Sequence, residues 1–133
     1  TAKYAAENGE WNILTLLIEN GNEICSNDVI NAVVVNPDLP YKIWKWLIGH
    51  ECFINRRTSE YAALNTNSYI SIEILKWLKT NGYPWDRMTA ANAALSGNLK
   101  VLQWLKQNGF KLDEWVCAYA AKGGHLDILK WAR

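Results

Sequence analysis

The sequence lacks the charge imbalance and the long apolar runs that several classes of protein require. Its 14 basic residues face 13 acidic ones, so the net charge is only +1. Binding to nucleic acid or to an anionic membrane needs a much larger basic excess. No apolar run approaches the roughly 18 residues of a membrane span, and no basic segment with a cleavage site opens the chain. We therefore expect neither nucleic acid nor a membrane as a partner.

Cysteine and histidine are also scarce. The three cysteines are odd in number and form no CxxC motif, and the chain has two histidines. This usage is typical of a reducing setting, so we expect an intracellular location such as the cytoplasm. His50 and Cys52 form a single pair, with Cys25 and Cys117 elsewhere, which is short of the four ligands of a structural zinc site. We expect no metal and no cofactor.

The sequence also lacks the residue combinations of common catalytic sites. No Asp-His-Ser ordering and no recurring carboxylate pair accompanies His50 or His125, although a catalytic histidine needs such a partner. Gly123 and Gly124 are not followed by the lysine and serine of a phosphate-binding loop. We therefore expect no enzymatic activity and no small-molecule substrate.

What the sequence does contain is internal repetition. Residues 75–82 read LKWLKTNG, and residues 102–109 read LQWLKQNG, 27 residues later. Aligning the tryptophans of the WL and WA pairs gives a column of four, spaced by 31, 27 and 27 residues: Trp46, Trp77, Trp104 and Trp131. A fixed period of this kind indicates a repeat architecture. We expect a single repeat domain over residues 1–133, with units at about 1–21, 22–51, 52–82, 83–109 and 110–133.

Each unit carries two helical patterns joined by a short turn. The second pattern is amphipathic: in residues 99–107 the apolar side chains fill a broad arc and the polar ones share the remainder. Gly82 and Gly109 follow it, where a left-handed residue ends a helix. The first pattern is rich in alanine, which lets neighbouring backbones approach closely. Turns of three or four residues allow only an antiparallel pair, so the fold class is all-α.

Several local features make more specific predictions. Residues 36–40, with two prolines, and residues 65–69 are expected to lengthen the turn inside their helix pairs. Thr58 and Thr89 are expected to be N-caps. A column of short polar residues between units is expected to cap or close the turn; its members are Asn55, Asp86 and Asp113.

Residues 118–133 read AYAAKGGHLDILKWAR and resemble an ankyrin repeat, with two alanines, a Gly-His turn and a second amphipathic helix. The likeness extends over five units, in a shortened, tryptophan-marked form similar to arrays of large DNA viruses and some protists. It implies an ankyrin-like solenoid of about five stacked antiparallel helix pairs with short inter-repeat loops. It also implies protein recognition without catalysis, and a structural role for Gly124 and His125.

The chain departs from the family pattern in two places. The TPLH signature is absent, since residues 88–91 read MTAA. The connection over residues 83–88 holds six residues, fewer than the β-hairpin finger of the family needs. We expect tight turns there and little regular strand.

The tryptophan column has two interpretations. Its members could stack nucleic-acid bases, as aromatic platforms do. Their common place on the mostly buried helix, and an expected lack of basic neighbours on one face, favour a packing ladder instead. We therefore assign Trp46, Trp77, Trp104 and Trp131 a structural role, together with the two helix-ending glycines.

Candidate partner-binding residues lie at the tips between units and on the first helices. The tip residues differ in charge and size from unit to unit, as a recognition edge would, although drift at a solvent-facing position gives the same variation. Tyrosines of the first helices could face a partner or fill gaps between stacked helices. The candidates are Arg56, Arg57, Tyr61, Trp85, Arg87, Asn92, Glu114, Trp115 and Tyr119.

Two functional hypotheses follow from this organisation. The first is a protein-interaction module, an intracellular scaffold that presents a rigid, extended surface to a protein partner. The alternative is an architectural spacer within a longer repeat protein, with no ligand of its own. The chain opens within a first helix, and Trp131 has nothing after it to cover it, so we expect further repeats on at least one side.

Overall fold

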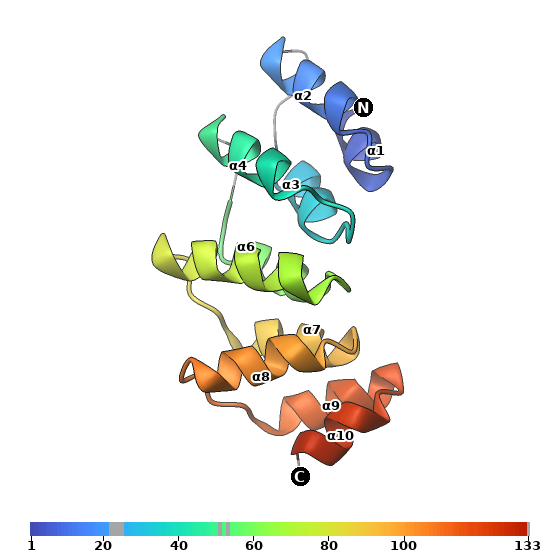
Figure 1. The fold of residues 1–133 in the computed structure, drawn as a ribbon, viewed down its shortest axis with the longest axis vertical. Helices are drawn as coiled ribbons and strands as arrows, with labels where there is room; N and C mark the ends of the chain where they lie inside the picture. Colours follow the sequence, from blue (N-terminus) through green and yellow to red (C-terminus); the bar gives the residue numbers. More distant parts are fainter. Residues whose placement is uncertain (22–25, 51, 53, 133) are drawn as a thin grey trace.

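The computed structural model describes residues 1–21, 26–50, 52 and 54–132. Cys25 lies outside the described residues. Within them the chain forms α-helices and no strand, which confirms the all-α fold and the short, strand-free connections (Figure 1). The helices are α1 (Ala2–Glu7), α2 (Trp11–Glu19), α3 (Asn27–Val34), α4 (Tyr41–Gly49), α5 (Arg57–Ala63), α6 (Ser68–Thr80), α7 (Arg87–Leu95), α8 (Leu99–Gln107), α9 (Glu114–Gly123) and α10 (Leu126–Ala132).

The helices form antiparallel pairs that stack along one axis, with the two termini at opposite ends (Figure 1). The first helices make a continuous row, in which α1 contacts α3, α3 contacts α5, α5 contacts α7 and α7 contacts α9. The second helices lie beside them, and α6 also contacts α8. Each unit therefore touches mainly its neighbours, which is the organisation of a solenoid.

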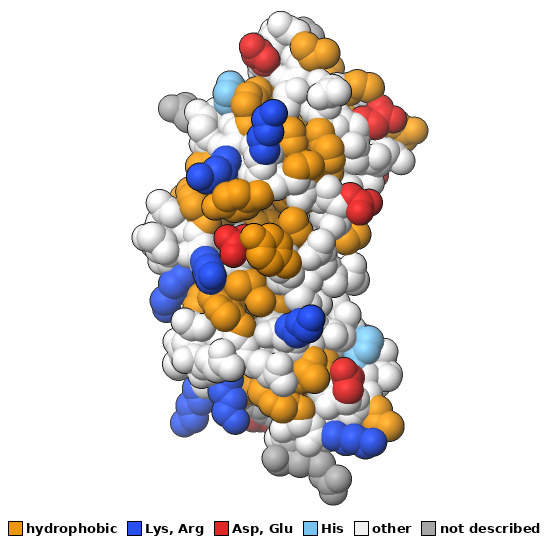
Figure 2. Space-filling view, in the orientation of Figure 1, with side chains coloured by type: hydrophobic (Ala, Val, Ile, Leu, Met, Phe, Trp, Pro, Cys, Tyr) orange, Lys and Arg blue, Asp and Glu red, His pale blue; other side chains and the backbone are white. Residues whose placement is uncertain are grey.

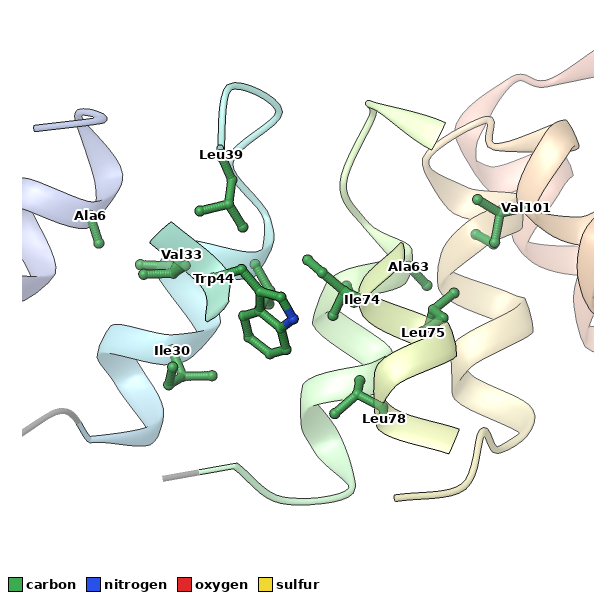
Figure 3. Packing of buried hydrophobic residues seen from close by; sticks show 14 of the residues in the cluster. Ala6, Ile30, Val33, Leu39, Trp44, Ala63, Ile74, Leu75, Leu78 and Val101 are labelled. Atoms are coloured by element: carbon green, nitrogen blue, oxygen red, sulfur yellow. The ribbon is translucent and has the colours of Figure 1, made fainter. Parts of the chain in front are cut away.

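The first helices approach closely because their buried positions hold small side chains. Fully buried alanines recur in this row, among them Ala6, Ala63, Ala91 and Ala94. Larger side chains fill the space between the first and second helices. In Figure 3, Trp44 of α4 points toward Ile74 and Leu78 of α6, and its ring meets Trp77 edge-on at 5.7 Å. The core is thus continuous from one unit to the next.

Two members of the polar column between units cap helices, and the third, Asn55, closes its turn by accepting from Arg57 N at 2.9 Å, as predicted. Asp86 is the N-cap of α7 and forms a capping box, in which its side chain accepts from Thr89 N at 3.0 Å and Thr89 Oγ1 accepts from Asp86 N at 3.0 Å. Asp113 caps α9 by accepting from Trp115 N at 3.0 Å. Each cap satisfies amides that the first helical turn leaves without partners.

Two of the predicted caps are wrong. Thr89 is the third residue of α7, because α7 begins at Arg87, directly after its aspartate cap. Thr58 lies inside α5, and its hydroxyl accepts from Asn55 N at 3.2 Å. Both threonines reach backward to the turn, so the helices begin two or three residues earlier than the threonines suggest.

The two longer units differ in where they place their extra residues. Pro37 and Pro40 keep residues 35–40 out of helix, and α4 begins directly after Pro40. The prediction that residues 65–69 form a longer turn is wrong, because α6 begins at Ser68. No proline stops the helix there, and Asn67 caps α6 by accepting from Ile70 N at 3.3 Å. The extra residues therefore lengthen α6 to 13 residues, against nine in α8.

Side chains in the turns between first and second helices tie each unit to the one before it. We call this set the inter-unit ladder. Each member donates to a backbone carbonyl near the end of the preceding first helix, and Asn65 and Asn98 are buried. The contacts are Asn36 Nδ2 to Ala6 O at 3.2 Å, Asn65 Nδ2 to Val34 O at 2.9 Å, Asn98 Nδ2 to Ala63 O at 2.9 Å and His125 Nε2 to Leu95 O at 2.9 Å.

Candidate partner-binding surface

Four of the predicted candidates meet at the junction of α7 and α9. The Arg87 guanidinium carbon lies 3.9 Å from the centroid of the Trp115 ring. Its Nε donates to Asp113 Oδ2 at 2.7 Å, and its Nη2 to Glu114 Oε1 at 3.4 Å. The Tyr119 ring lies 5.9 Å from that of Trp115. We call Arg87, Asp113, Glu114, Trp115 and Tyr119 the tip cluster.

Helix capping explains why these side chains meet. Arg87 and Glu114 each follow an aspartate N-cap, so each is the first residue of its helix, and the two helices pack side by side. Arg87 therefore reaches from one unit to the cap of the next. Trp115 and Tyr119 are four residues apart in α9, a spacing that puts both on one face of a helix.

The tip cluster is accessible and held in one arrangement. The side chains of Arg87, Asp113 and Glu114 are 47%, 35% and 82% exposed. An exposed ion pair contributes only about 0–1 kcal/mol, and an exposed cation–π contact about 0.5–1 kcal/mol. Together these contacts do little for stability, but they fix a long arginine side chain over an indole. Arginine, tryptophan and tyrosine are the residue types enriched at interface hot spots.

A cavity of about 540 Å³ adjoins the tip cluster and shares Asp113 and Glu114 with it. Its apolar lining includes Phe110, Leu112 and Trp131. A volume of this size falls in the range of pockets that take a large side chain or a small ligand. The surface thus combines a charged and aromatic edge with an apolar hollow.

Trp85 and Asn92 are engaged in packing between units. Trp85 Nε1 donates to Leu75 O at 3.0 Å, and the Trp85 ring meets Trp104 at 4.8 Å. Asn92 Nδ2 donates to Glu60 O at 3.0 Å, which ties α7 to α5. The structure therefore places these two candidates outside the tip cluster.

Arg56 and Arg57 lie exposed at the start of α5. Between α5 and α7 the Glu60 carboxyl faces the cap Asp86, and its pKa is raised by burial first and then by the charge of Asp86. The two arginines oppose this shift. They form a separate charged region, one unit away from the tip cluster.

Tyr61 lines a shallow groove of about 460 Å³ on the first helices. Ala32, Val35 and Leu64 make its apolar part, while Lys3 and Glu7 are among the charged residues at its edge. The groove involves α1, α3 and α5. It is a second accessible surface of the solenoid, distinct from the tip cluster.

The tryptophans of the repeat column are half-buried and pack against the core. The fully buried tryptophan is Trp44, which the repeat alignment did not single out. Trp46 stacks on His50 at 3.7 Å, and Lys106 lies over Trp131 at 5.5 Å. The expected lack of basic neighbours is thus wrong, since Lys106 lies over a tryptophan of the column.

The predicted structural glycines and His125 occupy special positions. Gly82, Gly109 and Gly124 have φ of 88°, 85° and 74°, in the left-handed region that glycine adopts without a steric penalty. The His125 ring lies against Gly97, where an added Cβ would come within 2.6 Å of His125 Cε1. The ring therefore fits only because its neighbour has no side chain.

The described residues also bear on metal binding, on a membrane span and on the state of the cysteines. No group of three or more His, Cys, Asp or Glu residues that could hold a metal occurs in the part of the chain that the structure describes. None of the described helices is both long and apolar enough to cross a bilayer. Cys52 is buried and disulfide-bonded, which the odd cysteine count did not foresee, and Cys117 is a free thiol. The intracellular location stays a prediction.

Comparison with known proteins gives a family match for the C-terminal part of the chain. Residues 88–133, about a third of the chain, match the family model described as ankyrin repeats (many copies). Neither the comparison with curated proteins nor that with solved structures gives a match. The fold is therefore an all-α, ankyrin-like helical solenoid, and the match supports the ankyrin-repeat superfamily. Repeats of this family are generally protein-interaction modules. The shortened, tryptophan-marked variety stays a prediction.

Sequence reasoning missed one member of the site. Asp113 was expected only as a cap, but its second carboxylate oxygen also holds Arg87. A signal was present: Arg87 and Glu114 occupy the same column of successive units with opposite charge. Because neighbouring units stack in register, such a pair indicates a cross-unit contact.

Proposed function

We propose that this chain is a protein-interaction module that binds a protein partner through the tip cluster and the cavity beside it. The observation that carries the proposal is the stacking of Arg87 on Trp115 at 3.9 Å with both oxygen partners in place. A side chain already fixed before binding loses little rotamer entropy in a complex. The surface is therefore ready to dock without rearrangement.

The solenoid adds to this readiness. The ladder residue His125 donates to Leu95 O at 2.9 Å, and α7 and α9 pack side by side with buried alanines in both helices, so these two helices are held at a fixed separation. The partner would insert an apolar side chain into the cavity lined by Phe110, Leu112 and Trp131, and it would place polar groups against Arg87. An architectural spacer would have no need for such an exposed cluster.

The proposal can be tested by affinity capture from extract followed by calorimetry with the purified partner. The test variant combines Arg87→Ala, Trp115→Ala and Tyr119→Ala. We expect it to bind the captured partner at least ~10-fold more weakly, since each hot-spot residue contributes more than about 1 kcal/mol.

A matched control removes one cation and two aromatic rings elsewhere on the exposed surface, through Lys3→Ala, Tyr4→Ala and Tyr69→Ala. It should bind like the unaltered chain. Equal weakening by both variants would argue against the tip cluster. If the folded chain captures no protein that depends on any of its surface residues, the spacer hypothesis is favoured instead.

A further inference from the structure

Charge is distributed unevenly between the two rows of helices. The first helices carry four basic and four acidic residues, so their charges balance. The second helices carry seven lysines, all on α4, α6, α8 and α10, against Glu19, Glu73 and Asp127, a net charge of +4 in a chain whose total is +1. We call these residues the lysine face: Lys42, Lys45, Lys76, Lys79, Lys100, Lys106 and Lys130.

All seven lysines are exposed. Figure 2 shows basic side chains at intervals along this side of the molecule, with hydrophobic ones beside them. Among the described residues, the salt bridges of this face are limited to Lys76 with Glu73, at 3.7 Å. Three others lie over aromatic rings: Lys45 over Tyr41 at 5.3 Å, Lys79 over Trp85 at 4.9 Å and Lys106 over Trp131 at 5.5 Å. A ring holds an ammonium in place without neutralising it.

We infer that the lysine face binds an acidic polypeptide segment, lying across successive second helices. Packed helices are about 8–10 Å apart, so the stack from α4 to α10 presents uncompensated positive charge once or twice per unit. An extended chain rich in glutamate and aspartate can match such a row, because its carboxylates are mobile and recur every few ångströms. Charge complementarity of this kind directs association and partner choice. Apart from Lys106, which also lines the cavity beside the tip cluster, the lysine face lies outside the surface of the proposed function, so one chain would contact two partners.

Nucleic acid fits this face less well. Single strands bind where bases can stack on open aromatic rings, but here the rings are already engaged. Trp46 stacks on His50, Trp77 meets Trp44, and Trp104 meets Trp85. The positive charge is also interrupted by Glu73, Asp127 and the neutral Gln103.

An anionic membrane also fits less well. Membrane-surface helices combine lysine with a continuous apolar face that enters the bilayer. On α4, α6, α8 and α10 the large exposed apolar side chains are single residues near helix starts: Tyr41, Tyr69 and Leu126. Ile13 and Leu16 are exposed on α2, which carries no lysine. Isolated tyrosines beside lysines suit contact with a polypeptide, where tyrosine is enriched.

The test measures fluorescence anisotropy of a labelled peptide of twelve glutamates at low salt and again at physiological salt. The variant Lys45→Gln, Lys76→Gln, Lys130→Gln removes three charges from the face. Its control, Lys3→Gln, Lys111→Gln, Lys122→Gln, removes three exposed charges elsewhere. We expect the first to weaken binding at least ~5-fold and the control to change it less than ~2-fold, with affinity falling as salt rises.

The experiment also includes a second variant and two competing ligands. A second variant, Lys42→Gln, Lys79→Gln, Lys100→Gln, avoids the cavity beside the tip cluster and should weaken binding similarly. Circular dichroism checks that each variant is folded. An equal loss of peptide affinity in the lysine-face and control variants, or no peptide binding at low salt, would overturn the inference. Tighter binding of a twelve-nucleotide thymidine strand, or of vesicles containing phosphatidylserine, would overturn it in favour of that partner. The tip-cluster variant should bind the peptide normally, so this site and the proposed function fail independently.

Discussion

The inter-unit ladder makes a strong prediction at Asn65. This side chain is fully buried. Its Nδ2 donates to Val34 O and to Asn36 O, both at 2.9 Å, and its Oδ1 accepts from Asn67 N at 2.9 Å. Asn65→Ala would remove all three hydrogen bonds and leave two carbonyls of the preceding unit without this donor.

The magnitude follows from the number of bonds. At about 1 kcal/mol for each net hydrogen bond, we expect Asn65→Ala to lower the free energy of unfolding by about 3 kcal/mol. For a chain of this length that is a fall of about 10 °C in Tm. Urea and thermal denaturation, followed by circular dichroism, measure both quantities.

Asn108→Ala is the matched control, because Asn108 is exposed and donates to Trp104 O at 2.8 Å within its own unit. It should cost less than about 0.5 kcal/mol, as for other exposed substitutions. A loss below ~1 kcal/mol for Asn65→Ala, or equal losses for the two variants, would refute the reasoning that the ladder holds the units together.

Three further predictions concern single sites. Glu60→Gln should raise Tm at pH 7 and leave it nearly unchanged at pH 4. The raised pKa of Glu60 beside Asp86 means that its charged form is disfavoured in the folded protein. Thermal melts at both pH values check this. Trp44→Ala should cost about 3–5 kcal/mol, since the ring is fully buried and fills the space between α4 and α6, as urea denaturation would show. Gly97→Ala should lower Tm, because its φ of 80° is left-handed and the new Cβ would meet the His125 ring at 2.6 Å.

Each of these has a contrary outcome. The sign of the Tm change for Glu60→Gln follows from a pKa of Glu60 that is higher in the folded than in the unfolded chain. Stability that Glu60 contributes at low pH is then lost as the pH rises through the folded-state pKa. A Glu60→Gln variant that is less stable at pH 7 would contradict it. A Trp44→Ala variant at least as stable as the Trp46→Ala variant would count against the described packing. So would a Gly97→Ala variant as stable as the parent chain.

The fold was largely predictable because its determinants are local. A period of 27 residues, alanine-rich first helices and glycines after the second helices each repeat along the sequence, and each independently favours stacked helix pairs. The aspartate caps were predictable for the same reason. The length of α6 was not predicted, because extra residues in a repeat can lengthen either a loop or a helix. The absence of proline from these residues favours the helix.

Other features depend on how units sit against each other, which the period does not give. Trp44 and Trp46 are two residues apart in α4, and the packing of α4 on α6 decides which of them is buried. Arg87 and Trp115 were both predicted as candidates, but their contact depends on the stacking of α7 on α9. The lysine face was missed because the net charge of +1 sums over two rows with different charges.

The most direct test of the account is amide hydrogen exchange of the chain with and without its captured protein partner. Binding through the tip cluster predicts slower exchange at residues 110–119, around Asp113 and Trp115, with α1 to α4 unchanged. Protection confined to other parts of the solenoid, or no protection while the partner is bound at saturation, would contradict the claim that this surface is the binding site.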